Sequence, residues 1–201
     1  MKIRSLMISE PITILKGTSI QEAIDVMKSH SIRHLPVVSI GGRLEGLVTL
    51  SDLKQGLIPS MVADLSLSDL MIRNPITVGP DEDVEVAAQY IYNYKIGGIP
   101  VVEGDRLVGI ITESDILRAF IDMMGVMTAS SRIDVAVGER QGALRDVLQT
   151  INENGGDVIN IGITARDIDR RVYFFRLASC KTDNIRKALE RKGFRVVAAM
   201  D

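Results

Sequence analysis

An internal repeat constrains this chain more than any other feature, because a repeat fixes the architecture before any local pattern is interpreted. Three apolar segments recur 64 residues later: residues 6–8 as 70–72, 11–13 as 75–77 and 36–38 as 100–102. After one deletion the spacing becomes 63, and Gly46, Thr49, Ser51 and Asp52 recur as Gly109, Thr112, Ser114 and Asp115. The chain therefore contains two copies of one unit.

Each copy shows the same order of hydrophobic periods. Ser19 and Glu22 form a capping-box pattern before apolar residues at helical spacing, and acidic residues 81–83 precede the equivalent helix in the second copy. Apolar runs separated by a glycine-containing turn predict β-hairpins at 35–38 with 46–49 and at 99–102 with 109–112. Ser51-Asp52 and Ser114-Asp115 are predicted to cap a further helix. The predicted order is βαββα, twice.

The last 71 residues follow a different pattern. A strand is predicted at 132–137, a helix around Leu144 to Ile151 that stops at 154–156, and strands at 158–163 and 172–177 on either side of a charged turn at 166–170. A helix at 184–192 and a strand at 194–199 follow. The order βαββαβ is ferredoxin-like, so the predicted fold class is α+β.

Composition limits the function classes. The chain has 201 residues, of which 46% are hydrophobic and 25% charged, with a net charge of -2, which is typical of a globular protein and disfavours nucleic-acid binding. No apolar run reaches the roughly 18 residues of a membrane span, and the N-terminus lacks a signal-peptide pattern. The single cysteine, Cys180, favours a reducing compartment and excludes a cysteine-built metal site. We therefore expect a cytoplasmic protein with no membrane or nucleic-acid partner.

The two copies resemble a tandem pair of CBS (cystathionine-β-synthase-type) domains, since each carries a Pro-Val-Val strand and a Gly-x-x-Thr-x-Ser-Asp segment. On this resemblance we assign residues 1–64 and 65–127 to the two CBS repeats. The region 131–201 resembles an ACT domain, a small ferredoxin-like module. A CBS pair followed by an ACT-type domain is similar to the bacterial acetoin-utilisation type of CBS-ACT protein.

The resemblance implies a regulatory module that binds adenosine-containing ligands (AMP, ADP, ATP or S-adenosylmethionine) between the repeats. Asp52 and Asp115 match the family's ribose-binding aspartate, and an aspartate can accept from both ribose hydroxyls. The alternative is that both aspartates only cap helices. The implied ligand-binding set is Thr13, Arg33, His34, Leu35, Thr49, Ser51, Asp52, Thr77, Gly98, Ile99, Thr112, Ser114 and Asp115.

The ACT resemblance implies an amino-acid-like effector. The residues that match are Gln141, Gly142 and Ala143 at the turn into the first helix and Asn154 after it. The turn reads Glu139-Arg140-Gln141-Gly142, where the family often has an acidic or amide residue and a proline. The alternative is a dimerisation domain with no ligand.

The two clefts are expected to differ. Arg33 precedes the Pro-Val-Val strand of the first copy, whereas Gly97 holds the same place in the second. A guanidinium can hold a phosphate with a forked pair of donors, so we expect an Arg33 cleft that prefers phosphorylated ligands and a glycine cleft that accepts a bulkier or less charged one. The alternative is that Arg33 is a solvated charge.

We expect a non-catalytic sensor rather than an enzyme. No phosphate-binding loop is visible, Cys180 has no histidine near it in sequence, and His30 and His34 are typical of packed or capping residues. Tyr90 and Tyr94 share a helix face and are predicted to pack together. Self-association would cover the exposed sheet edge and helix faces, so a homodimer is expected, together with a regulated partner that the sequence does not identify. The alternatives are an assembly adaptor without ligand and a small nucleotide-processing enzyme.

Overall fold

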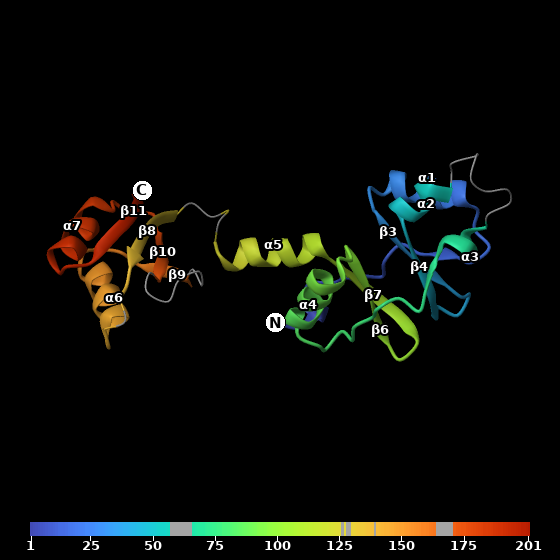
Figure 1. Ribbon diagram of the computed structural model, residues 1–201, viewed down its shortest axis with the longest axis horizontal. Coiled ribbons are helices and arrows are strands. Elements are labelled where there is room, and N and C mark those ends of the chain that lie inside the picture. The colour runs from blue at the N-terminus through green and yellow to red at the C-terminus, as the bar shows by residue number, and fades with distance from the viewer. Residues whose placement is uncertain (57–65, 126, 128–129, 139, 164–170) are drawn as a thin grey trace. The chain divides into compact units, whose positions relative to one another are not determined.

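The computed structural model describes residues 1–56, 66–125, 127, 130–138, 140–163 and 171–201. It contains two compact units, Met1–Leu117 and Arg118–Asp201, and the division falls within helix α5 (Glu113–Met123) (Figure 1). The predicted turn at 166–170 lies outside the described residues. Among the described helices, none combines the length and apolar character needed to cross a membrane.

The first repeat folds as predicted, with helices packed against a small mixed sheet. The sheet order is β2 (Ile14–Leu15), β3 (His34–Val38), β4 (Leu44–Thr49) and β5 (Ile72–Arg73), in which only β2 and β3 are parallel. Helices α1 (Ile20–Ser29), α2 (Leu50–Gly56) and α3 (Leu67–Leu70) belong to this half. The predicted capping box of Ser19 and Glu22 is confirmed, and it begins α1 with both reciprocal hydrogen bonds formed.

The second repeat follows the same plan with one strand shortened. Its sheet order is β1 (Ile8–Ser9), β7 (Arg106–Thr112) and β6 (Gly98–Glu103), with a 3-10 turn at Ile3–Ser5 and helices α4 (Val84–Tyr94) and α5. The predicted first strand is reduced to a single parallel bridge between Val78 and Val101. This bridge is the counterpart of the Ile14 and Val37 pairing in the first repeat.

The two repeats exchange their N-terminal segments. Strand β1 belongs to the first repeat in sequence but pairs with β7 of the second, and β5 belongs to the second repeat in sequence but pairs with β4 of the first. Ile3 is fully buried in the core of the second repeat, and Leu67 is buried in the core of the first. Each hydrophobic core is therefore incomplete without a segment that belongs, in sequence, to the other repeat.

Two glycines make this exchange possible. A Cβ at Gly109 would lie 2.6 Å from Met7 Sδ, and one at Gly46 would lie 2.9 Å from Met71 Sδ. Because contacts below 3 Å to a packed side chain require the neighbour to move, only glycine allows each methionine to cover the adjacent strand. Gly46 and Gly109 recur in the sequence for this reason.

The tips of the two hairpins are joined by a symmetric pair of backbone hydrogen bonds. Leu44 N donates to Asp105 O at 3.0 Å, and Leu107 N donates to Gly42 O at 3.1 Å. Both hairpins also contain a bulge at the same place, after Val37 and after Val101. These contacts fix the two hairpins relative to each other, and with them the space between the repeats.

The predicted caps of α2 and α5 were wrong by two or three residues. The N-cap positions belong to Thr49 and Thr112, because α2 begins at Leu50 and α5 at Glu113. Asp52 Oδ2 accepts from both the N–H of Thr49 at 2.9 Å and its hydroxyl at 2.7 Å. A threonine that donates twice to a carboxylate three residues later satisfies two donors at once, and this favours the capping-box arrangement over an aspartate cap.

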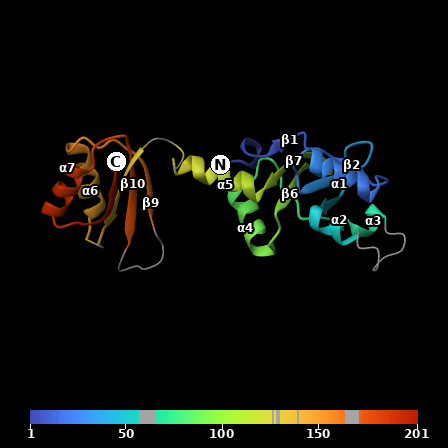
Figure 2. The same ribbon diagram turned by 90° about the horizontal axis from the view of Figure 1, so that it is seen from above.

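The second unit has the predicted βαββαβ order. Its elements are β8 (Ser130–Ala136), α6 (Ala143–Glu153), β9 (Val158–Ile163), β10 (Val172–Ala178), α7 (Asp183–Arg191) and β11 (Arg195–Met200). The sheet order is β11-β8-β10-β9, all neighbours are antiparallel, and both helices cover the same face (Figures 1 and 2). The core between helices and sheet contains Phe175, Ile133, Val147 and Leu189, all fully buried.

The exchange of segments predicts where an N-terminal substitution acts. Ile3→Ala is expected to destabilise the protein by about 2–5 kcal/mol, because it removes a fully buried side chain and leaves a cavity. Hydrogen exchange should show the lost protection in β6 and β7 rather than in β3 and β4. Ile40→Ala, at a side chain that is 96% exposed, is the matched control and should leave the unfolding midpoint unchanged. Lost protection confined to the first repeat would contradict the exchange.

Candidate functional site

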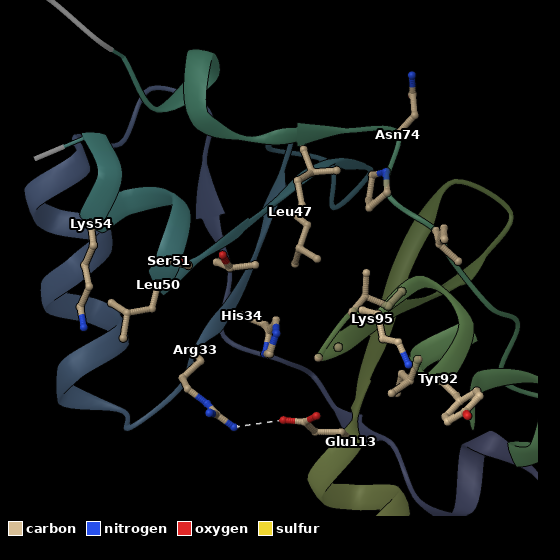
Figure 3. A pocket seen from close by; sticks show the side chains of 18 residues that line it. Arg33, His34, Leu47, Leu50, Ser51, Lys54, Asn74, Tyr92, Lys95 and Glu113 are labelled. Atoms are coloured by element: carbon tan, nitrogen blue, oxygen red, sulfur yellow. Dashed lines mark hydrogen bonds and ion pairs between the residues drawn. The ribbon is translucent and has the colours of Figure 1, made fainter. Parts of the chain in front are cut away.

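A cavity of about 970 Å³ lies between the two repeats, and both line it (Figure 3). The first repeat contributes the residue before β3, the start of β3, the end of β4 and the first turns of α2. The chain entering the second repeat, the end of α4 and the start of β6 form the other walls. The cavity is therefore lined by residues from five stretches of the chain, within 33–34, 47–54, 72–76 and 91–98 and at Glu113.

The walls of the cavity are largely apolar. Aliphatic side chains face it from both repeats and from the segment that joins them: Leu47, Leu50, Ile72, Pro75, Ile76, Ile91 and Ile96. A flat aromatic group would bury its faces against such a surface, and each Å² of apolar surface removed from water contributes about 25 cal/mol. Thr49 and Ser51, at the start of α2, form what we call the polar end of the cavity, while other polar side chains, among them Asn74 and Lys95, line other sides of it (Figure 3).

Asp52 borders this polar end through its bond to Thr49. Its Oδ2 holds the threonine N–H and hydroxyl, whereas its Oδ1 accepts no hydrogen bond from the part of the chain that the structure describes. The same arrangement recurs in the second repeat, where Asp115 Oδ2 accepts from Thr112 N at 2.8 Å and Thr112 Oγ1 at 2.6 Å. Each aspartate thus holds its threonine through one carboxylate oxygen, Oδ2.

His34 packs against two glycines of the other repeat. A Cβ at Gly97 would lie 2.8 Å from His34 Nε2, and one at Gly98 would lie 3.1 Å from His34 Cγ. This corrects the expectation of a glycine cleft that accepts a bulkier ligand, because the space beside Gly97 and Gly98 is filled by the imidazole ring of His34. Burial lowers the pKa of His34 and the Arg33 guanidinium lowers it further, against opposing effects of Glu113 and Asp52, so the ring is neutral near pH 7.

Arg33 forms an ion pair across the cavity. Its Nη2 lies 3.5 Å from Oε1 of Glu113, the first residue of α5, and both side chains are more than half exposed (Figure 3). The expected separation into an Arg33 cleft and a glycine cleft was wrong, because Arg33, Gly97 and Gly98 all line this one cavity. Segments at equivalent places in the two repeats meet at a shared cleft.

The structure brings together part of the predicted ligand-binding set. Arg33, His34, Thr49, Ser51 and Gly98 line the cavity. Leu35 and Ile99 do not, since both side chains are fully buried in the cores of their repeats. The remaining predicted residues are not among those that line it: Thr13, Asp52, Thr77, Thr112, Ser114 and Asp115.

Several lining residues were missed by the sequence analysis, chiefly Lys54, Asn74, Tyr92, Lys95 and Glu113. Asn74 and Lys95 adopt left-handed backbone conformations with φ of 52° and 56°. A left-handed backbone is uncommon for residues other than glycine, although asparagine adopts it more readily than lysine, and it often marks functional sites. Lys95 Nζ lies 4.3 Å from the centre of the Tyr92 ring. 

The predicted packing of Tyr90 on Tyr94 is confirmed, with ring centres 5.9 Å apart.

In the second unit the candidate effector residues do not meet within one chain. Gly142 is the N-cap of α6 with φ of 84°, Ala143 is buried at the first turn, and Asn154 is the C-cap. With a rise of 1.5 Å per residue, the two ends of this helix lie about 16 Å apart. Asn154 instead lines a hollow between the helices with Asn184, Lys187, Glu190 and Arg191. Among the described residues, no group of three or more acidic, histidine or cysteine side chains could hold a metal ion.

Both repeats match the profile of one known domain family. The CBS domain profile matches residues 3–58 and 67–122. Homoserine O-acetyltransferase of Methanohalobium evestigatum is 38% identical over 117 residues, which make up 58% of this chain and 23% of the relative. The chain thus spans about a quarter of the length of the first curated relatives that it matches.

Three solved structures are among those to which this chain is similar. The CBS domain pair of protein MJ0100, in complex with 5'-methylthioadenosine and S-adenosyl-L-methionine, is 36% identical with a TM-score of 0.56 and covers 60% of this chain and 95% of its own. AcuB of Vibrio cholerae, a candidate acetoin utilization protein, is 32% identical with a TM-score of 0.57, covering 63% and 94%. CBSX2 in complex with AMP is 25% identical with a TM-score of 0.54, covering 60% and 96%.

The burial of His34 predicts a pH-dependent stability. The folded state holds this ring neutral, whereas the unfolded chain binds a proton below about pH 6.5, so the free energy of unfolding should rise with pH through that range and fall as the solution is acidified. Denaturant titrations between about pH 5.5 and 7.5 measure this slope. His34→Asn should flatten it, while His30→Asn, at the exposed end of α1, should not. Equal slopes for wild type and His34→Asn would exclude the effect.

Proposed function

This chain belongs to the CBS domain family, and we propose that it is a non-catalytic regulatory sensor that binds an adenosine-containing ligand in the cavity between its two repeats. The observation that carries this proposal is the combination of aliphatic walls with a threonine and aspartate pair at one end of the cavity. The complexes of MJ0100 with 5'-methylthioadenosine and S-adenosyl-L-methionine, and of CBSX2 with AMP, support it.

The chemistry of the cavity matches the three parts of such a ligand. An adenine ring is flat and largely apolar on its faces, as are the walls formed by the aliphatic side chains. The ribose hydroxyls would donate to Asp52 Oδ1, whose position is held by the two bonds from Thr49 to Oδ2. The group at the 5' position would reach the charged pair of Arg33 and Glu113.

The polar groups around the cavity already have structural partners, which favours binding over catalysis. Asp52 is engaged by Thr49, Arg33 by Glu113, and His34 is packed against Gly97 and Gly98. Because the contacts of Arg33 and His34 connect the two repeats, a ligand that binds one relative placement of the repeats more tightly would shift the population toward it. This is the proposed means of regulation, acting on a partner protein of the cytoplasm.

The second unit is proposed to be an ACT-type domain. Its βαββαβ order, antiparallel sheet and one-sided helices support a ferredoxin-like assignment. An amino-acid-like effector would bind between copies, since the matching residues at the two ends of α6 do not meet within one chain. The likeness to AcuB supports a link to acetoin utilisation.

We propose that the chain forms a homodimer through its exposed strand β9. This strand is an edge of its sheet among the described strands, and Ile159, Ile161 and Ile163 are 49%, 42% and 51% exposed. An apolar edge with unpaired backbone groups favours pairing with another strand, and a second copy offers an identical edge that can pair antiparallel about a two-fold axis.

The role of Asp52 can be separated from that of a helix cap. Asp52→Asn is expected to weaken adenosine-ligand binding about tenfold or more, because a charge-assisted bond contributes about 1.5–3 kcal/mol. Isothermal titration calorimetry with AMP and S-adenosylmethionine measures this. The matched control is Asp69→Asn, since Asp69 Oδ2 accepts from Ser66 N and Oγ in the same kind of capping box, but Ser66 does not line the cavity as Thr49 does. Equal affinities for all three proteins would show that Asp52 only caps its helix, whereas no binding by the wild type would favour the ligand-free adaptor.

Sedimentation equilibrium tests the proposed dimer. The wild type is expected at twice the chain mass of 22.0 kDa at micromolar concentration, and Ile161→Lys should shift it to the monomer by placing a charge at the edge. Ile40→Lys, on an exposed turn of the first repeat, should leave the dimer intact. A wild-type monomer would overturn the proposal.

A further inference from the structure

We propose that the charged end of the cavity selects an adenosine ligand whose 5' group is an amino-acid tail, in preference to one whose 5' group is a phosphate. The inference rests on the proposed function and names the ligand class of the same site. It depends on one pair of side chains, Arg33 and Glu113, that lines the cavity from opposite repeats (Figure 3).

The two side chains are placed by matching backbone hydrogen bonds. Leu50 N donates to Arg33 O at 3.0 Å, and Glu113 N donates to Gly97 O at 3.1 Å. The first bond fixes Arg33 beside the start of α2, next to the Thr49 and Ser51 end of the cavity. The second fixes Glu113 beside the segment just before β6 in its own repeat, and its Oε1 lies 3.5 Å from Arg33 Nη2. Both charges therefore lie at the polar end, where the 5' group of a bound nucleoside would emerge.

The pair is held loosely enough to open. Its separation is 3.5 Å, longer than that of a strong charge-assisted bond, and the side chains of Arg33 and Glu113 are 65% and 54% exposed. Exposed ion pairs contribute little to stability, so separating these two groups costs little. A ligand that offers each of them a new partner can take the place of their mutual contact.

An amino-acid tail offers both partners at once. Its carboxylate accepts two parallel bonds from a guanidinium, and its ammonium donates to a carboxylate. Inserted between Arg33 and Glu113, such a zwitterion replaces one ion pair with two and leaves no charge unpaired. A phosphate in the same position would pair with Arg33 but would meet the like charge of Glu113, which disfavours it.

The other cations near the cavity do not offset this repulsion at the same place. Lys95 Nζ lies over the Tyr92 ring at 4.3 Å, where it already has an electrostatic partner. Lys54 extends from α2 on the side of the cavity away from Glu113 (Figure 3). Glu113 is therefore the residue that decides between the two tails, and phosphate preference is the alternative outcome of the test.

Three ligands isolate the contribution of the tail. S-adenosylhomocysteine carries an amino-acid tail on an uncharged thioether, 5'-methylthioadenosine carries the thioether without the tail, and AMP carries a phosphate. In calorimetric titrations of the full chain we expect the wild type to bind S-adenosylhomocysteine about tenfold more tightly than either of the others. Glu113→Gln should weaken S-adenosylhomocysteine about tenfold, leave 5'-methylthioadenosine unchanged and tighten AMP.

The control is Glu45→Gln, which removes the same charge from an exposed position on β4 outside the cavity and should alter none of the three affinities. The inference alone is overturned if AMP binds the wild type more tightly than S-adenosylhomocysteine, or if Glu113→Gln weakens 5'-methylthioadenosine and S-adenosylhomocysteine equally. If none of the three ligands binds the wild type, the proposed function fails and the inference fails with it.

Discussion

The mutual completion of the two repeats is the constraint on which the rest of the first unit depends. Strands β1 and β5 each close the sheet of the opposite repeat, and Met7 and Met71 cover Gly109 and Gly46 at distances that allow no Cβ. Because each repeat buries chain that belongs to the other in sequence, the two cannot move apart without exposing both cores. Because the cavity lies between the two repeats, this exchange also determines where the cavity lies.

Local patterns predicted most of the fold because they are set by local physics. The Ser19 and Glu22 box, the helical spacing that follows it and the stop after α6 at Gly155, whose φ is 84°, each depend on residues within a few positions. The exchange could not be predicted in this way. The segments at 6–8 and 70–72 are recognisable as parts of the repeated unit, but nothing in them shows which of two equivalent sheets they join.

The candidate site was predictable only where the repeat itself pointed to it. Thr49 and Ser51 line the cavity and lie in a repeated segment, whereas Asn74, Lys95 and Glu113 occupy positions at which the two copies differ. Those differences matter because the cleft uses one copy's Arg33 against the other copy's Glu113. Comparing the two repeats position by position predicts two separate clefts. In the structure, Arg33 of one repeat and Gly97 and Glu113 of the other line the same cavity.

The left-handed residues extend the symmetry to the backbone. Glu10 and Asn74 have φ of 52°, and Ser31 and Lys95 have φ of 54° and 56°, so the same bends recur in both repeats under different side chains. Side chains diverged while the path of the chain did not, as expected if a symmetric pair of identical half-length chains preceded the fused protein. In such an ancestor the segments now exchanged within one chain would have been swapped between two, and fusion would have made their pairing independent of protein concentration.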